Sequence, residues 1–274
     1  MSIKISLAGD VGSGKSTVSA ILVERLGATY YSTGAICREV AASHGMSVVE
    51  MNVYMETHPE LDHEIDDGVR ALAYRKEDLI IDSRMAFHFV EGSFRVYMAT
   101  QTEESARRIM KAGRATEQFA TFEDAVAQVR TRKASERKRY SDLYGVDCKD
   151  LSNYDLVVDT TFASPEEVAC CIIDALKEWE EDKTKRACFV CPRRFLYPDD
   201  APDFSRVEKL SALLDEGMED VGTVEAVESD GTFYATGNVE VALAYSLSDV
   251  ALVPTRLTVG NPPRGTFVPM ADHL

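Results

Sequence analysis

Cysteine and long apolar segments are scarce in this chain, and each scarcity argues against a class of protein. The 274 residues include six cysteines and one tryptophan. The cysteines are too sparse for a disulfide scaffold, and we expect them to be reduced thiols. No apolar run of about 18 residues occurs, which argues against a transmembrane helix. A basic segment followed by an apolar signal core is also missing at the N-terminus, so we expect a cytoplasmic protein with no membrane partner.

Positive charge is also in short supply, but it is unevenly distributed. Thirty Lys and Arg stand against 46 Asp and Glu, for a net charge of −16, which argues against a nucleic-acid partner. Residues 107–139 reverse this balance, with ten basic and four acidic side chains. A cationic island in an acidic protein is typical of a pocket for a compact anion.

Near the N-terminus, three glycines, a lysine and two hydroxyl residues follow a short apolar run in "ISLAGDVGSGKSTV" (5–18). Residues 3–8 are expected to form a buried strand, and 17–27 have helical apolar spacing with Gly27 as the C-cap. The pattern G-x-x-x-x-G-K-S in this context predicts a phosphate-binding loop. Glycines let backbone N–H groups converge on an anion, and the helix dipole favours negative charge there. The residues expected to bind the triphosphate are Gly9, Gly12, Ser13, Gly14, Lys15, Ser16 and Thr17.

Two further segments predict strand ends that face this loop. In "ATYYSTGAICREV" a short strand runs into a helix, with Ser32 or Thr33 as its N-cap. In "LIIDSRMAF" a buried strand over 79–81 ends at Asp82, Ser83 and Arg84. Ligands of open parallel sheets lie at the carboxyl ends of strands. Asp82 therefore suits Mg²⁺ held through water, with Ser16 as a direct ligand, and Arg84 suits an acceptor's phosphate.

The order of "GDVGSGKST", "YYSTGAICRE", "LIIDSR", "ERKRYSDLYGVD" and "YDLVVDT" resembles the cytidylate kinase family, in particular its compact archaeal-type members. The resemblance covers roughly residues 1–178. It implies a P-loop core, a monophosphate-binding region, an arginine-bearing lid, and ATP with Mg²⁺ as cofactors. Residues that match the monophosphate site, or lie beside it, are Ser32, Gly34, Arg38, Arg84, Arg139 and Tyr140. Those expected to act in catalysis are Lys15, Asp82, Arg108, Arg114, Arg132 and Arg137.

The arginine-rich segment "RTRKASERKRY" supports this interpretation without the resemblance. Arg130 and Arg137 are seven residues apart, as are Arg132 and Arg139, so each pair shares one helix face. Phosphoryl transfer depends on positioning and on positive charge around the moving group. A mobile lid carrying arginines supplies both and excludes water.

The chain changes character beyond the charged stretch at residues 177–186. We expect a first domain over 1–183 and a smaller α+β domain over 187–274, with a hairpin at Asp230–Gly231 followed by a helix and a strand. This part weakly resembles the ParB/sulfiredoxin-like fold, with Asn238, Val239 and Glu240 at the positions of that family's basic residues. Cys188 and Cys191 form a lone C-x-x-C that lacks the four ligands zinc needs.

The sequence therefore predicts an α/β fold, a P-loop NTPase parallel sheet flanked by helices, with a smaller C-terminal α+β domain. The expected activity is Mg²⁺-assisted phosphoryl transfer from ATP to a nucleoside monophosphate, CMP or dCMP, in a monomer or small homo-oligomer. Two alternatives stay open: a kinase for another small acceptor, and a nucleotide-binding regulator with little turnover.

Overall fold

The chain divides into two compact units, Met1–Asp155 and Leu156–Leu274. The computed structural model describes residues 2–113, 119–200 and 202–270. The strands β1–β4 belong to the first unit and β5–β11 to the second.

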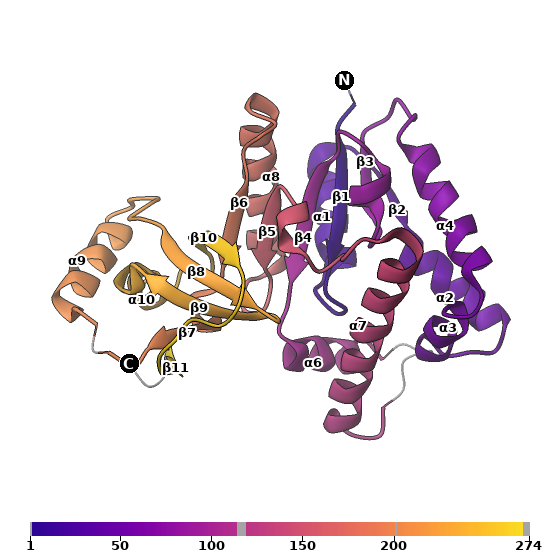
Figure 1. Cartoon of the computed structure of the whole chain (residues 1–274). Coiled ribbons are helices and arrows are strands. Elements are labelled where there is room, and N and C mark those ends of the chain that lie inside the picture. Colours follow the sequence, from indigo (N-terminus) through magenta and orange to yellow (C-terminus); the bar gives the residue numbers. More distant parts are fainter. Residues whose placement is uncertain (1, 114–118, 201, 271–274) are drawn as a thin grey trace. The chain divides into compact units, whose positions relative to one another are not determined.

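Unit 1 is built on a parallel sheet with the strand order β4-β1-β3-β2 (Figure 1). Alternation is absent from β1, β3 and β4, which are buried along nearly their whole length because both faces of the sheet are covered there. Ile5, Leu7, Ile80, Ile81 and Val96 are completely buried. Burying each such side chain contributes about 1.5–3 kcal/mol. The strands are β1 (Lys4–Gly9), β2 (Thr29–Ser32), β3 (Leu79–Asp82) and β4 (Phe94–Ala99).

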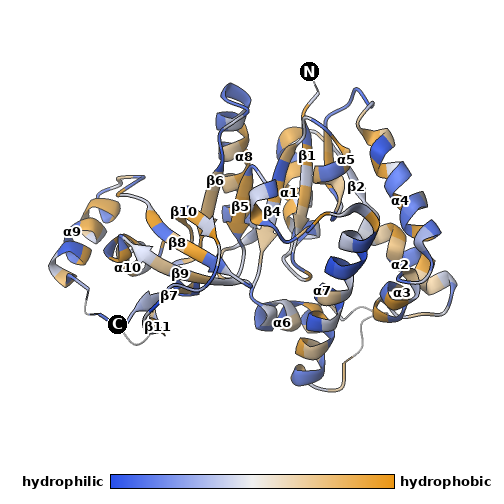
Figure 2. Cartoon of the chain, in the orientation of Figure 1, coloured by the Kyte–Doolittle hydropathy of each residue, from blue (hydrophilic) through white to orange (hydrophobic). Residues whose placement is uncertain are grey.

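The helices of unit 1 begin and end where their capping residues predict. Ser32 caps one helix through Ala35 N–H, Gly27 ends another in the left-handed conformation, and Thr121 forms a capping box with Asp124. Hydrophobic and hydrophilic residues alternate along α4 (Figure 2). The helices are α1 (Lys15–Leu26), α2 (Thr33–Ser43), α3 (Val48–Met55), α4 (Pro59–Leu72), α5 (Ala86–Phe89), α6 (Thr102–Ala112), α7 (Phe122–Tyr144) and the short 3-10 helix η1 (Leu151–Asn153).

Unit 2 contains a mixed sheet with the order β5-β6-β10-β8-β9-β7-β11. Strand β5 pairs with β6 in parallel, whereas β8 and β9 form an antiparallel hairpin. Its strands are β5 (Leu156–Asp159), β6 (Ala187–Val190), β7 (Phe195–Pro198), β8 (Val224–Ser229), β9 (Thr232–Gly237), β10 (Val253–Val259) and β11 (Phe267–Pro269). Its helices are α8 (Pro165–Glu181), η2 (Pro192–Arg194), α9 (Phe204–Asp215) and α10 (Val239–Leu247).

The expected fold class is confirmed, and so is the order of hairpin, helix and strand near the C-terminus. The boundary between the compact units, however, falls between Asp155 and Leu156, ahead of the expected boundary at 183–187. The reason is that β5 pairs with β6 beyond that expected boundary. A functional division at 183–187 stays a prediction.

No helix in the described part of the chain is both long and apolar enough to cross a membrane.

Candidate active site

The loop between β1 and α1 has the backbone that a phosphate cradle requires. Gly9, Gly12 and Gly14 have φ of +143°, +74° and +84°, values that residues with a Cβ rarely adopt. A Cβ on Gly12 would lie 2.9 Å from the Ser105 carbonyl oxygen, and one on Gly9 would overlap the Met98 carbonyl. The glycines therefore provide both the conformation and the close packing of the loop.

Lys15 begins α1 and turns its ammonium group back onto this loop. Its Nζ donates to the carbonyl oxygens of Gly9 (3.3 Å) and Asp10 (3.0 Å) and to Ser13 Oγ (3.3 Å). Burial and the neighbouring Arg84 lower the pKa of Lys15 to about 7. An anion at the loop would favour the charged ammonium. Ser16 and Thr17, which follow, are exposed.

Asp82 lies at the carboxyl end of β3, directly opposite Ser32 in the register with β2. Its Oδ2 accepts hydrogen bonds from Tyr30 Oη (3.0 Å) and Ser32 Oγ (3.4 Å). The Tyr30 hydroxyl also hydrogen-bonds with Ser16. The two residues predicted to serve Mg²⁺, Ser16 and Asp82, are thus joined through one tyrosine.

The predicted monophosphate segment is folded around Gly34. A Cβ at this position would lie 3.5 Å from Arg38 Nη1 and 3.8 Å from Ser32 Oγ. The structure therefore brings Ser32, Gly34 and Arg38 together at the start of α2, where backbone N–H groups favour an anion.

Glu136, on α7, holds two of the predicted arginines. Its Oε2 accepts from Arg84 Nε at 2.8 Å, and its Oε1 accepts from Arg132 Nε at 3.0 Å. The Glu136 side chain is 7% exposed, and the two guanidinium groups hold its pKa well below its usual range despite burial. This buried carboxylate fixes the direction of both arginines.

The two arginine pairs on α7 lie on different faces. The Arg132 side chain is 16% exposed and Arg139 is buried. Arg130 and Arg137 are more than half exposed and pair with Glu103 and Asp147. Of the predicted catalytic residues, Arg132 therefore lies on the buried face and Arg137 on the exposed face.

Arg108 approaches the phosphate loop from α6. Its Nη1 lies 3.9 Å from the Cβ position of Gly14, and its Nε donates to Glu104 at 3.0 Å. Arg114 lies outside the described residues.

Arg139 belongs to a second polar cluster, formed where α7 meets α3 and α4. Its Nη1 donates to the Asn52 carbonyl (3.3 Å) and Oδ1 (3.2 Å), and its Nη2 donates to Tyr140 Oη (3.3 Å). Its Nε lies 3.0 Å from Asp62 Oδ2. Burial raises the pKa of Asp62 to about 6, although Arg139 opposes this shift. The cluster thus combines buried donors with a buried acceptor.

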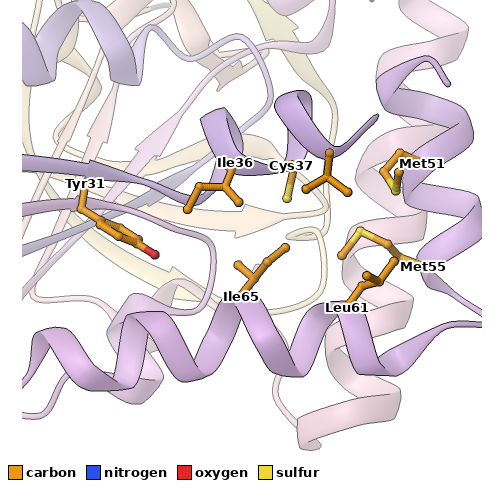
Figure 3. A pocket seen from close by; sticks show the side chains of 8 residues that line it. Tyr31, Ile36, Cys37, Met51, Met55, Leu61 and Ile65 are labelled. Atoms are coloured by element: carbon orange, nitrogen blue, oxygen red, sulfur yellow. The ribbon is translucent and has the colours of Figure 1, made fainter. Parts of the chain in front are cut away.

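An apolar cavity of about 250 Å³ lies between β2, α2, α3 and α4 (Figure 3). Asn52 and Asp62 each directly follow a residue that lines the cavity. The thiol of Cys37, which also lines it, interacts electrostatically with Arg139 and Asp62. The polar cluster is therefore adjacent to the cavity. The cavity is lined by Tyr31, Ile36, Cys37, Val40, Met51, Met55, Leu61 and Ile65.

Sequence reasoning did not single out Tyr30, Asn52, Asp62 or Glu136 as site residues. One signal was available: Glu136 follows Arg132 by four positions and precedes Arg139 by three, the spacing of one helix face. Asn52 and Asp62 have no such signal, because they reach Arg139 only through the packing of three helices.

No group of three or more His, Cys, Asp or Glu side chains is placed to hold a metal within the described residues. Cys191 donates to the Asp159 carbonyl at 3.5 Å, and burial raises the pKa of both Cys188 and Cys191. These two thiols therefore belong to the packing of unit 2. Glu240, near the start of α10, pairs with Arg206 at 3.5 Å.

A strand, glycine loop and helix, with an inward lysine and arginines from the following helices, define a P-loop kinase. Residues 4–162 match the cytidylate kinase-like family. The cytidylate kinase of Thermoplasma acidophilum is 37% identical over 180 residues, which span 64% of this chain and 93% of that protein. The chain belongs to the cytidylate kinase-like family, and it is a nucleoside monophosphate kinase.

Two solved structures have weaker likenesses. Shikimate kinase from Bacteroides thetaiotaomicron covers 64% of this chain and 98% of its own, with 13% identity and a TM-score of 0.46. Sulfiredoxin from Arabidopsis thaliana covers 27% of this chain and 85% of its own, with 15% identity and a TM-score of 0.24. The ParB/sulfiredoxin-like resemblance of the C-terminal part stays a prediction.

Proposed function

We propose that this kinase transfers the γ-phosphoryl group of ATP to CMP or dCMP, yielding ADP and the corresponding diphosphate. The observation that carries the choice of base is the buried Arg139–Asp62 pair beside the apolar cavity. An apolar cavity of this kind suits the faces of a planar base, and polar groups at its margin would read the base's edge.

The pair has unused hydrogen-bonding capacity. Asp62 and Arg139 are 3% and 5% exposed. Although Asp62 Oδ2 and Arg139 Nε lie 3.0 Å apart, their alignment is not that of a hydrogen bond, and neither atom has another hydrogen-bond partner in the described part of the chain. Buried polar atoms left in this state favour a ligand that satisfies them.

Cytosine matches this pair better than uracil does. It presents an amino donor beside a ring-nitrogen acceptor, which fit a carboxylate and a guanidinium respectively. Uracil presents the opposite order, an acceptor where cytosine has the donor. Its carbonyl oxygen would face the Asp62 carboxylate, so UMP would be the poorer acceptor.

The remaining site residues have roles in the transfer itself. Loop amides and Lys15 would hold the triphosphate, and Arg38 with Ser32 would hold the acceptor phosphate. Arg84, Arg108 and Arg132 would surround the transferring group with fixed positive charge. Ser16 and, through water, Asp82 would hold Mg²⁺, which neutralises developing charge on the phosphates. The Tyr30 hydroxyl, which hydrogen-bonds to both Ser16 and Asp82, would orient these two residues toward the metal.

The test is ADP formation from ATP and Mg²⁺ with CMP, dCMP, UMP, AMP, GMP or no acceptor. We expect strong stimulation by CMP and dCMP and a kcat/KM for UMP lower by at least about tenfold, the value of one base-edge contact. Asp62→Asn should reduce the difference in kcat/KM between CMP and UMP. The matched control is Asp67→Asn on the same helix, whose side chain is 74% exposed. Absence of stimulation by any monophosphate would overturn the proposal in favour of another acceptor or a regulatory role.

A further inference from the structure

Asp10, the second residue of the phosphate loop, turns its carboxylate away from solvent. Its Oδ2 accepts from the Thr100 backbone N–H at 2.9 Å, and its Oδ1 accepts from Tyr97 Oη at 3.2 Å. Asp10 is 9% exposed. The residue is therefore tied to the end of β4.

Three lysines from distant parts of the sequence converge on Asp10. Lys133 of α7 places its Nζ 3.2 Å from Oδ1, and Lys149 hydrogen-bonds to the same oxygen. Lys149 also donates to Tyr97 Oη at 2.7 Å. Lys15 donates to the Asp10 backbone carbonyl at 3.0 Å. Only Lys15 belongs to the phosphate-loop motif.

This arrangement concentrates more positive charge than Asp10 neutralises. Two ammonium groups share one carboxylate oxygen, and like charges so close repel each other in a site of low dielectric. Both side chains are partly exposed, Lys133 at 19% and Lys149 at 22%. A polyanion at the loop would relieve the repulsion.

We propose that Lys133 and Lys149 bind the phosphates of the nucleoside triphosphate, and that Asp10 holds both ammonium groups beside the loop until the ligand arrives. The inference rests on the proposed use of ATP. Because Lys133 lies on α7 and Lys149 in the segment after it, a bound triphosphate would hold both of these elements against the loop.

The test measures binding of ADP and of tripolyphosphate by calorimetry, without Mg²⁺ and without a monophosphate acceptor. Lys133→Met and Lys149→Met should each weaken both ligands about tenfold, the loss of one charge-assisted hydrogen bond. The matched control is Lys138→Met on α7, whose side chain is 64% exposed and pairs with Asp142. This control should leave both affinities unchanged.

The Asp10→Asn variant distinguishes the proposed role of Asp10, holding the two lysines for a ligand, from a purely structural link between the loop and β4. The amide can keep the hydrogen bond from Thr100 N–H, while the competing negative charge is lost. We expect tripolyphosphate to bind several-fold more tightly to this variant. Weaker binding by Asp10→Asn, or unchanged affinities in both Met variants together with lowered melting temperatures, would overturn the inference. If a Met variant does not fold, Asp10→Asn decides alone. None of these binding measurements depends on turnover. A failure of CMP and dCMP as acceptors would therefore be distinguishable from a failure of the proposed role of the two lysines.

Discussion

At the scale of single residues, Glu136 orders two arginines of the candidate site. Unpaired buried guanidinium groups are costly, and a carboxylate that bridges two of them offsets their desolvation. The Glu136 oxygens accept hydrogen bonds from Arg84 and Arg132. The same carboxylate attracts the Lys15 ammonium group electrostatically. Positive charge is therefore fixed in place before substrates bind, so it need not be reorganised during transfer.

Asp62 gives the proposed base recognition a pH dependence. Its pKa is raised to about 6, so the carboxylate becomes protonated as the pH falls through this value. The protonated group is a poor acceptor for the cytosine amino group. We expect the KM for CMP to rise severalfold between pH 7 and pH 5, measured by steady-state kinetics.

The phosphate of CMP titrates in the same range, near pH 6, and Asp62→Asn is the control for this effect. In that variant the substrate and other groups such as Lys15 still titrate but Asp62 does not, so its KM should change less over the same range. Identical profiles for the two proteins would contradict the role of Asp62.

At the scale of elements, α7 separates two kinds of arginine by its helical period. Arg132 and Arg139 lie on the buried face, whereas Arg130 and Arg137 are exposed. Exposed ion pairs contribute about 0–1 kcal/mol, so Arg130 and Arg137 add little to stability. The helix thus presents one arginine face to the site and leaves the other to solvent.

The phosphate loop should be intolerant of side chains at its glycines. Gly12→Ala forces φ of +74° on alanine and places Cβ 2.9 Å from the Ser105 carbonyl oxygen. We expect a loss of about 2–3 kcal/mol in the free energy of unfolding, measured in urea, and weaker ADP binding.

Gly45→Ala is the matched control for that substitution, because Gly45 has φ of +68° with nothing within 4 Å of its Cβ position. It should cost about 1 kcal/mol from conformation alone and leave ADP affinity intact. Equal losses of unfolding free energy and of ADP affinity in the two variants would show that the close packing of Gly12 in the phosphate loop is unimportant.

At the scale of the molecule, the C-terminal residues are tied to β5 by a buried ion pair inside unit 2. Arg194 Nε lies 3.4 Å from Asp159 Oδ1, and its Nη2 donates to the Gly231 carbonyl at 3.0 Å. The guanidinium also lies over the Phe233 ring. Arg194 thereby joins the end of β5 to the β8–β9 hairpin.

Removal of Arg194 should therefore destabilise the protein through an uncompensated charge. The Asp159 side chain is completely buried. Arg194→Met leaves that carboxylate without its cation, and we expect a loss of about 3 kcal/mol in the free energy of unfolding. The measurement is urea unfolding of the full chain followed by circular dichroism.

Arg256→Met serves as the control for this ion pair. Arg256 is 75% exposed and pairs with the half-exposed Glu225, so its loss should cost less than about 1 kcal/mol. If the two variants were equally stable, Arg194 would have no special part in joining β5 to the hairpin.

The sequence by itself determined the local elements and the phosphate loop. Gly27 and Ser32 cap the helices that their patterns predict, and the hairpin turns at Asp230–Gly231. These features depend on residues close together in the chain, where backbone geometry and hydrogen bonding follow from side-chain type. The apolar runs likewise predicted the buried parallel strands.

The tertiary structure alone decided which charged groups meet. Asp62 reaches Arg139, Asp10 reaches Lys149, and β5 pairs with β6 beyond the expected domain boundary. Each contact joins residues far apart in the sequence, so no local spacing encodes it. Burial then changes the chemistry of Asp62 and Lys15, because the loss of water and the close charged partners shift the pKa of both groups.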